Sequence, residues 1–216
     1  MKVVQPFVLL GAGGHGKVLL ALAHALGLRV EGVCDPGVAS SSCKQWLGVD
    51  VLGSDEVLDM FNPSQVALIN GIGQVPLSQL RENVFVRARA KGFAFPSLVH
   101  PAAWVADDVV FDEGVQVMAG SIVQPGVRVG TNSVLNSRSS VDHDCVVGSH
   151  VHVAPGAVLC GSVVVGDHAF VGAGATVIQG VRIGAGAVIG AGAAVMRDVA
   201  NGAVVYGAKG SVRQSC

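Results

Sequence analysis

Large apolar residues recur at every sixth position from Val99 to Val195, over seventeen successive positions. Four residues after each of these, a second row is mostly small, as at Ser121, Cys145 and Ala157. A period of six fits neither the 3.6-residue period of an α-helix nor the two-residue period of a simple strand. It is typical of a hexapeptide parallel β-helix, in which three hexads form one coil and the large residues stack inside. A Val- and Gly-rich β-sandwich gives no reason for such unbroken spacing, so we expect a β-helix domain over residues 99–216.

The preceding residues, 1–98, alternate between short apolar runs and glycine-rich turns. The run Phe7–Leu10 predicts a buried strand, and it leads into a turn that contains Gly11, Gly13 and Gly16. Helical spacing over 17–26, a second strand over 29–34 and an acid at Asp35 complete a Rossmann-like βαβ unit. Further along, the pattern predicts a strand at 66–69, a helix at 80–91 and a last strand at 93–98.

Glycines in such a turn let the backbone approach a pyrophosphate, whose charge is bound by amides at the helix N-terminus. A second glycine loop, which contains Gly71, follows the strand at 66–69, and ligands bind at these strand ends in open α/β sheets. An unliganded tight turn is the alternative. The domain is too short for both halves of a dinucleotide fold, so a nucleotide-linked sugar suits it better than NAD.

Composition excludes several classes of protein. Half of the residues are apolar, 13% are charged and the formal net charge is −1, so we expect a folded chain without affinity for nucleic acid. The apolar stretch at 18–28 is too short to span a bilayer, and the N-terminus lacks a signal-peptide pattern. Five cysteines without framework spacing indicate reduced thiols. These features predict a cytoplasmic protein that is not inserted into a membrane.

The order of the two domains, together with the stretches Gly11–Lys17, His100–Pro101 and Asn136–Gly161, resembles the nucleotide-amino-sugar N-acetyltransferases of bacterial glycan synthesis. The wider hexapeptide-repeat family includes the bacillosamine, perosamine and sialic acid O-acetyltransferase types. The resemblance implies that the β-helix is left-handed. It also implies a homotrimer that transfers an acetyl group from acetyl-CoA to a nucleotide-linked 4-amino-4-deoxy sugar, UDP- or GDP-linked.

The same resemblance assigns roles to individual residues. It implies that His143 is the general base and that Asp144 assists it. Acetyl-CoA contacts are implied for His152, Gly161, Ala173 and Ala191. Nucleotide-sugar contacts are implied for Gly13, Gly14 and His15, and for Asp35 and Pro36.

The residues themselves support this chemistry. A histidine with a pKa near ~6.5 can take the proton of an attacking amine at neutral pH, and a neighbouring carboxylate strengthens it as a base. His143 follows the inward residue Val141, so we expect it to project outward, into a cleft between subunits of the trimer.

Three alternatives remain open. In the first, His143 is only a surface residue. In the second, the acetylated group is a sugar hydroxyl, and in the third the protein is a non-catalytic scaffold of a glycan pathway. His150 and His168 fit structural or solvent-facing positions. Cys145, His150, His152 and Cys160 match no usual metal spacing, and we predict no metal site.

Overall fold

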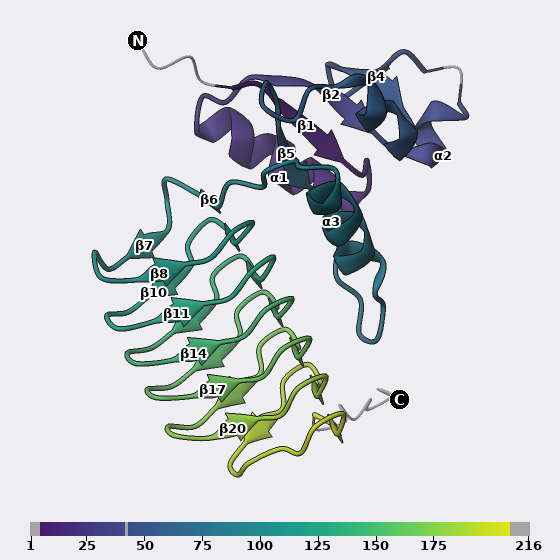
Figure 1. Ribbon diagram of the computed structural model, residues 1–216. Helices are drawn as coiled ribbons and strands as arrows, with labels where there is room; N and C mark the ends of the chain where they lie inside the picture. The colour runs from purple at the N-terminus through teal and green to yellow at the C-terminus, as the bar shows by residue number, and fades with distance from the viewer. Residues whose placement is uncertain (1–4, 42, 208–216) are drawn as a thin grey trace, which may run out of the picture.

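The computed structural model describes residues 5–41 and 43–207, so both chain ends, including Cys216, lie outside the described residues. The N-terminal part is a five-stranded sheet with the order β3-β4-β2-β1-β5, next to a column of stacked coils (Figure 1). Strands β1 (Phe7–Leu10), β2 (Val30–Cys34) and β5 (Ala67–Asn70) are parallel. Helices α1 (Gly14–Ala25) and α3 (Leu80–Ala90) accompany them. The predicted βαβ unit is therefore confirmed.

Four short elements were not predicted. They are α2 (Pro36–Ala39), the antiparallel pair β3 (Gln45–Trp46) and β4 (Val49–Gly53), and the 3-10 helix η1 (Asp55–Met60). Only Leu58 of η1 is buried in these four elements, so none of them shows a buried apolar run or a hydrophobic period.

The predicted strand at 93–98 is wrong. Residues 93–97 are not in a strand, because the Phe93 N–H donates to the Ala88 carbonyl oxygen and the Phe95 N–H to the Glu113 carboxylate rather than to a neighbouring strand. Only Leu98 of the predicted range belongs to a strand. That strand, β6 (Leu98–Val99), is already the first strand of the β-helix and spans the predicted domain boundary.

The second half is a parallel β-helix with three faces of two-residue strands. Each of the seventeen strands from β6 to β22 ends on one of the large apolar residues of the hexad series, as predicted. The first face holds β6, β9 (Gln116–Val117), β12 (Val134–Leu135), β15 (His152–Val153), β18 (Phe170–Val171), β21 (Val188–Ile189) and β23 (Val204–Val205). The second face holds β7 (Trp104–Val105), β10 (Ile122–Val123), β13 (Ser140–Val141), β16 (Val158–Leu159), β19 (Thr176–Val177) and β22 (Ala194–Val195). The third face holds β8 (Val110–Phe111), β11 (Arg128–Val129), β14 (Val146–Val147), β17 (Val164–Val165) and β20 (Arg182–Ile183).

The core of the β-helix consists of these stacked apolar residues and of the small row. Val117 and every later member of the apolar series are buried, and the small residues Ser121, Cys145 and Ala157 have no exposed area. Between strands the chain turns through a left-handed residue, as at Asp144 with φ 59°. Such a turn bends the chain sharply at each corner, which leaves room for only a small side chain beside it.

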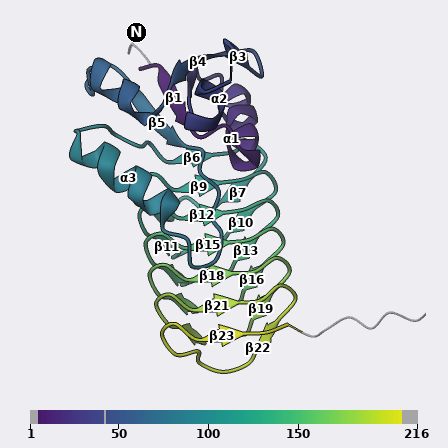
Figure 2. The same cartoon turned by 90° about the vertical axis from the view of Figure 1, so that its right-hand side faces the viewer.

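The N-terminal part packs directly on the first face of the β-helix. Leu19 and Leu22 of α1 share a buried cluster with Leu98, Met118 and Val134 of the β-helix. In Figure 2, α1 and α3 flank the column of first-face strands near its upper end. No helix within the described residues is long and apolar enough to cross a membrane.

Candidate active site

His143 occupies an exposed corner between the second and third faces of the β-helix. Its Nδ1 lies 2.8 Å from Asp144 Oδ2, and its backbone N–H donates to Asp142 Oδ1. The hydrogen bond to Asp144 is the main reason that the pKa of His143 is raised, and the charges of Asp142 and Asp144 add to it. A neutral His143 that donates Nδ1–H to Asp144 keeps a lone pair on Nε2, so this nitrogen can accept a proton.

Gly161 stacks on this histidine from the next coil. A Cβ at position 161 would lie 2.5 Å from His143 Nε2 and 2.7 Å from Cε1. The absent side chain therefore makes the space in which the imidazole lies, and it keeps the ring close to the β-helix surface.

The first glycine turn offers open space at the start of α1. A Cβ at Gly13 or Gly14 would meet nothing within 4 Å, and neither residue has a positive φ. Neither conformation nor internal packing requires glycine here, and the open space would let a ligand approach the helix N-terminus. Gly71 differs: it is buried, and its Cβ would lie 2.7 Å from the carbonyl oxygen of Leu10. Its missing side chain serves the contact between the two glycine loops.

Asp35 organises the same turn. Its Oδ2 accepts a hydrogen bond of 2.8 Å from the Ala12 backbone N–H. Its Oδ1 accepts from the backbone N–H groups of Gly37 and Val38, which caps α2 with Pro36 in the first turn. The carboxylate thus holds the first glycine turn against α2, in addition to any ligand contact.

His15 connects the glycine turn to the β-helix. Its Nε2 lies 2.9 Å from Oε1 of Gln116, on strand β9. Gln116 Nε2 in turn donates to the Asn70 carbonyl oxygen at the end of β5. Burial, followed by the positive charge of Arg81, lowers the pKa of His15 to about 4, although the bond to Gln116 acts in the opposite direction. His15 is therefore neutral at physiological pH.

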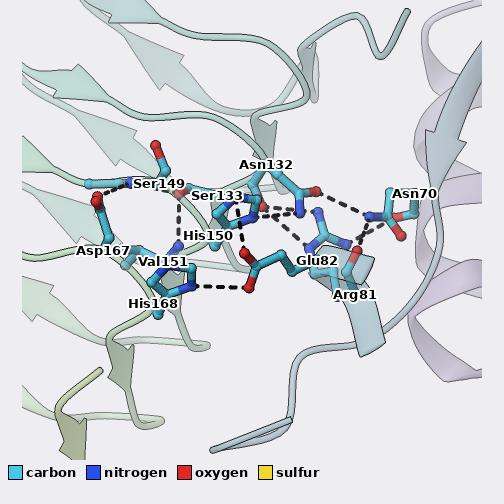
Figure 3. Close-up of polar contacts among 11 residues, drawn as sticks. Asn70, Arg81, Glu82, Asn132, Ser133, Ser149, His150, Val151, Asp167 and His168 are labelled. Atoms are coloured by element: carbon cyan, nitrogen blue, oxygen red, sulfur yellow. Dashed lines mark hydrogen bonds and ion pairs between the residues drawn. The ribbon is translucent and has the colours of Figure 1, made fainter. Parts of the chain in front are cut away.

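Arg81 ties the second glycine loop to a corner of the β-helix, as Figure 3 shows. Its Nη1 donates to the carbonyl oxygens of Asn70 and Ile72, both at 2.9 Å, and its Nε lies 3.4 Å from the Asn132 carbonyl oxygen. Arg81 is only 2% exposed, and burial lowers its pKa to about 9. At neutral pH it is a buried cation that carbonyl groups satisfy.

The same corner carries a ladder of side chains, which lies to the left of Arg81 in Figure 3. Asn132 Nδ2 lies 3.0 Å from His150 Nδ1, and the rings of His150 and His168 stack at 5.2 Å. Glu82 of α3 lies 3.2 Å from His168 Nδ1 and 3.9 Å from His150 Nε2. The two histidines therefore join α3 to the β-helix, in agreement with the structural alternative. The described residues contain no group of three or more His, Cys, Asp and Glu side chains that could hold a metal ion.

His152 lies on the first face, two coils below Gln116, and is 6% exposed. Its ring stacks on Phe170 at 5.0 Å, and its Nε2 is 3.5 Å from Asn136 Nδ2. Its Nδ1 is the one buried side-chain polar atom of the described residues without a hydrogen-bond partner. Burial, followed by the charges of His15 and Arg81, lowers its pKa to about 3. Buried polar atoms rarely stay unpaired, so this neutral imidazole fits a ligand atom as its partner.

Comparison with known proteins agrees with this arrangement. Residues 7–88 match the PglD N-terminal domain, and residues 162–197 match the bacterial transferase hexapeptide (six repeats).

Solved structures match over nearly the whole chain. The acetyltransferase domain of PglB from Neisseria gonorrhoeae, in complex with acetyl coenzyme A, is 33% identical with a TM-score of 0.86, over 94% of this chain and 96% of that one. PerB from Caulobacter crescentus, in complex with CoA and GDP-perosamine, is 36% identical with a TM-score of 0.86, over 95% of both chains. WeeI from Acinetobacter baumannii is 26% identical with a TM-score of 0.77, over 94% of this chain and 96% of that one.

The chain belongs to the hexapeptide-repeat nucleotide-amino-sugar N-acetyltransferases. As in this family, its β-helix is left-handed. The family and the fold class expected from the sequence are thus confirmed.

The residues predicted to form the site lie in separate places on this family member. His143, Asp144 and Gly161 share the corner between the second and third faces. Ala173 and Ala191 are exposed at the corner between the first and second faces. His152 lies on the first face, and His15 lies in the first turn of α1, where it contacts Gln116 of the same face. One chain therefore does not bring the predicted base and the predicted sugar loop together.

Four polar residues lie at the junction, the contact between the N-terminal part and the β-helix, and were not predicted to take part in a site. They are Asn70, Arg81, Gln116 and Asn132. The sequence contained one sign that Gln116 takes part in a site. It is polar at a strand position where its neighbours on the same face, Leu98 and Val134, are apolar. Arg81 gave no such sign, since an arginine in the first turn of a helix is ordinarily solvated.

Proposed function

We propose that this protein transfers the acetyl group of acetyl-CoA to the amino group of a nucleotide-linked 4-amino-4-deoxy sugar, UDP- or GDP-linked. The observation that carries the proposal is the His143 geometry: Nδ1 is bonded to Asp144, and Nε2, above Gly161, makes no hydrogen bond within the described residues. The bound CoA and GDP-perosamine named for PerB support the same pair of substrates. We expect the reaction in the cytoplasm, where acetyl-CoA is available.

In this mechanism the sugar amine attacks the thioester carbonyl carbon, and a C–N bond forms as the C–S bond breaks. His143 Nε2 takes the proton that the amine loses and then passes it to the sulfur of the departing CoA thiolate, which leaves the imidazole neutral again. Donor and acceptor are bound together, so no acyl-enzyme is required. His152 Nδ1 is our candidate for a contact with acetyl-CoA, because it is buried and without a partner among the described residues.

Acetyl-CoA is further proposed to lie beside Gly161, Ala173 and Ala191. The acceptor is proposed to contact the first glycine turn, with its diphosphate at Gly13 and Gly14, and the residues His15, Asp35, Pro36 and Gly71. The open space at Gly13 and Gly14 supports this position, since it lies at the N-terminus of α1.

A homotrimer would complete this divided site. The outward side chains of the second and third faces include exposed apolar residues such as Trp104, Ile122 and Val146, and apolar surfaces of this kind favour contact with another copy. Such packing would bring the His143 corner of one copy toward the first face and the sugar loop of its neighbour. Sedimentation at micromolar concentration should give a trimer, and a clean monomer with full activity would contradict this.

Product analysis tests the reaction. Purified protein is incubated with acetyl-CoA and with UDP-, GDP- or CMP-linked sugars, in amino and hydroxyl forms, and both CoA release and product mass are measured. N-acetylation of a 4-amino sugar supports the proposal. Acetylation of hydroxyl groups alone would favour the O-acetyltransferase alternative, and no turnover with any acceptor would favour the scaffold.

Replacement of Gly13 tests whether the two substrate sites are separate. Gly13→Leu fills the open space at the start of α1, so the acceptor KM should rise while the acetyl-CoA KM stays within about twofold. Equal damage to both substrates would argue against separate sites.

A further inference from the structure

The orientation of the Gln116 amide is determined by its two neighbours. Gln116 Nε2 lies 2.9 Å from the Asn70 carbonyl oxygen, which can only accept a hydrogen bond. The amide nitrogen must therefore face Asn70, and Oε1 must face His15 at 2.9 Å. Gln116 is 2% exposed, so water does not compete for these bonds.

This orientation selects one tautomer of His15. Gln116 Oε1 can only accept, so His15 Nε2 must carry a hydrogen and donate it. In the neutral ring, Nδ1 then holds the lone pair. Within the described residues His15 Nδ1 makes no hydrogen bond. The one fully buried side-chain polar atom there without a partner is His152 Nδ1, so His15 Nδ1 must be accessible at the surface.

The groups around His15 favour its neutral form. Arg81 of α3 is the nearby cation, Gln116 of β9 is uncharged, and His152 of β15 is itself neutral because burial lowers its pKa to about 3. A neutral imidazole accepts a hydrogen bond at Nδ1, whereas an imidazolium would donate at both nitrogens and attract a diphosphate. The ring therefore suits a hydrogen-bond donor of the ligand rather than its anionic part.

We propose that Gln116 is a positioning residue for acceptor recognition. It holds His15 as the Nε2–H tautomer, so that the Nδ1 lone pair accepts a hydrogen bond from a hydroxyl or amino group of the nucleotide-linked sugar. This inference rests on the proposed function and adds Gln116, which acts through His15 from the β-helix, to the sugar-binding residues. In this role the hydrogen bond between Gln116 and His15 also connects the first glycine turn to β9 of the β-helix.

The decisive variant is Gln116→Glu, which places a carboxylate beside His15 Nε2 and favours the imidazolium. The acceptor KM should then rise by ~3–10-fold as pH falls from 8 to 6, the loss of about one hydrogen bond, whereas wild type should not show this rise. Gln65→Glu adds the same charge at an exposed position before β5, at the opposite edge of the sheet, and should behave as wild type. The double variant His15→Phe/Gln116→Glu should lose the pH dependence.

The opposite slope would overturn the inference: an acceptor KM that falls at low pH means that cationic His15 binds the diphosphate. A second variant, Gln116→Met, keeps the side-chain length but removes both hydrogen bonds, and its acceptor KM should rise at every pH while the acetyl-CoA KM stays unchanged. A wild-type acceptor KM in Gln116→Met would also overturn the inference.

Imidazole ¹⁵N NMR of the wild-type protein tests the tautomer without turnover. A neutral His15 with its hydrogen on Nε2 is expected, and a hydrogen on Nδ1 would refute the positioning role. This readout separates the two proposals: failure to acetylate any nucleotide-linked amino sugar removes the proposed function, whereas an altered tautomer removes only the role of Gln116.

Discussion

The exposed corner at His143 and the covered junction around His15 and His152 shift the pKa of histidine in opposite directions. At the corner, the imidazole is solvated and bonded to Asp144, and its pKa is raised. At the junction, burial and the Arg81 cation lower the pKa of both histidines, to about 4 and about 3. The corner suits a group that takes up a proton during turnover, and the junction suits groups that stay neutral and make hydrogen bonds.

The difference shows that the environment of a histidine on the β-helix depends both on its position in the hexad and on what packs against that position. A turn residue such as His143 points into solvent, whereas an outward strand residue such as His152 becomes buried if another element covers its face. In this protein the N-terminal part packs on the first face, where α1 and α3 flank the strands (Figure 2). The predictions below test the two environments separately.

The largest expected effect is the loss of the corner histidine. His143→Ala should lower kcat by ~10²–10⁴-fold, the range for a lost general base. Both KM values should change little, because the imidazole acts mainly in the transition state. Steady-state kinetics from pH 6 to 8 measures this, and near-normal turnover would remove His143 from the mechanism.

The next effect concerns the space that Gly161 leaves for His143. Gly161→Ala should displace the imidazole and lower kcat by ~10–100-fold, since small misplacements of reacting groups are costly. In a His143→Ala background the same substitution should lower kcat almost no further, because the clash with the imidazole is gone. Additive losses in the double variant would instead assign Gly161 a role independent of His143.

Asp144→Asn should have a smaller effect on kcat than the loss of His143, because Asp144 tunes the base without replacing it. The active form of His143 is unprotonated, so activity falls as pH drops through its pKa. Removing the charge that raises this pKa should move the acidic limb of kcat/KM to lower pH. A limb that does not move in the pH profile would show that Asp144 does not control the base.

The junction makes stability depend on pH. The folded-state pKa of His152 is lowered, so below about pH 6.5 the unfolded chain binds a proton that the native protein does not. The free energy of unfolding should therefore fall on acidification, by about 1.4 kcal/mol per pH unit from this group alone. His15 acts in the same direction.

Urea unfolding at pH 7 and pH 5 measures this loss. His152→Gln should lose about 2 kcal/mol less than wild type over the interval, because Gln cannot take up the proton. His143→Gln is the matched exposed control: the pKa of His143 is raised, so its removal should not reduce the acid sensitivity. Equal slopes for wild type and His152→Gln would contradict a buried neutral His152.

Much of this protein could be predicted from its sequence because its main contacts are periodic. In the β-helix each coil packs on the next, so the hexad series from Val99 to Val195 determined all seventeen strands and the outward projection of His143. The βαβ unit was equally predictable, because its glycine turn and its apolar runs are local signals. The short hairpin of β3 and β4 was not, since neither strand contains a buried residue and so neither shows a buried apolar run.

Only the tertiary structure decided what lies over the first face. Gln116, Val134 and His152 occupy equivalent outward positions in successive coils, and nothing in the hexad says that the N-terminal part will pack on this face. Arg81 and Asn132 are 51 residues apart, yet they meet at the junction. Burial is a property of what packs against a residue, and it is burial, together with a cation brought from α3, that holds His15 and His152 neutral while His143 stays open to protonation.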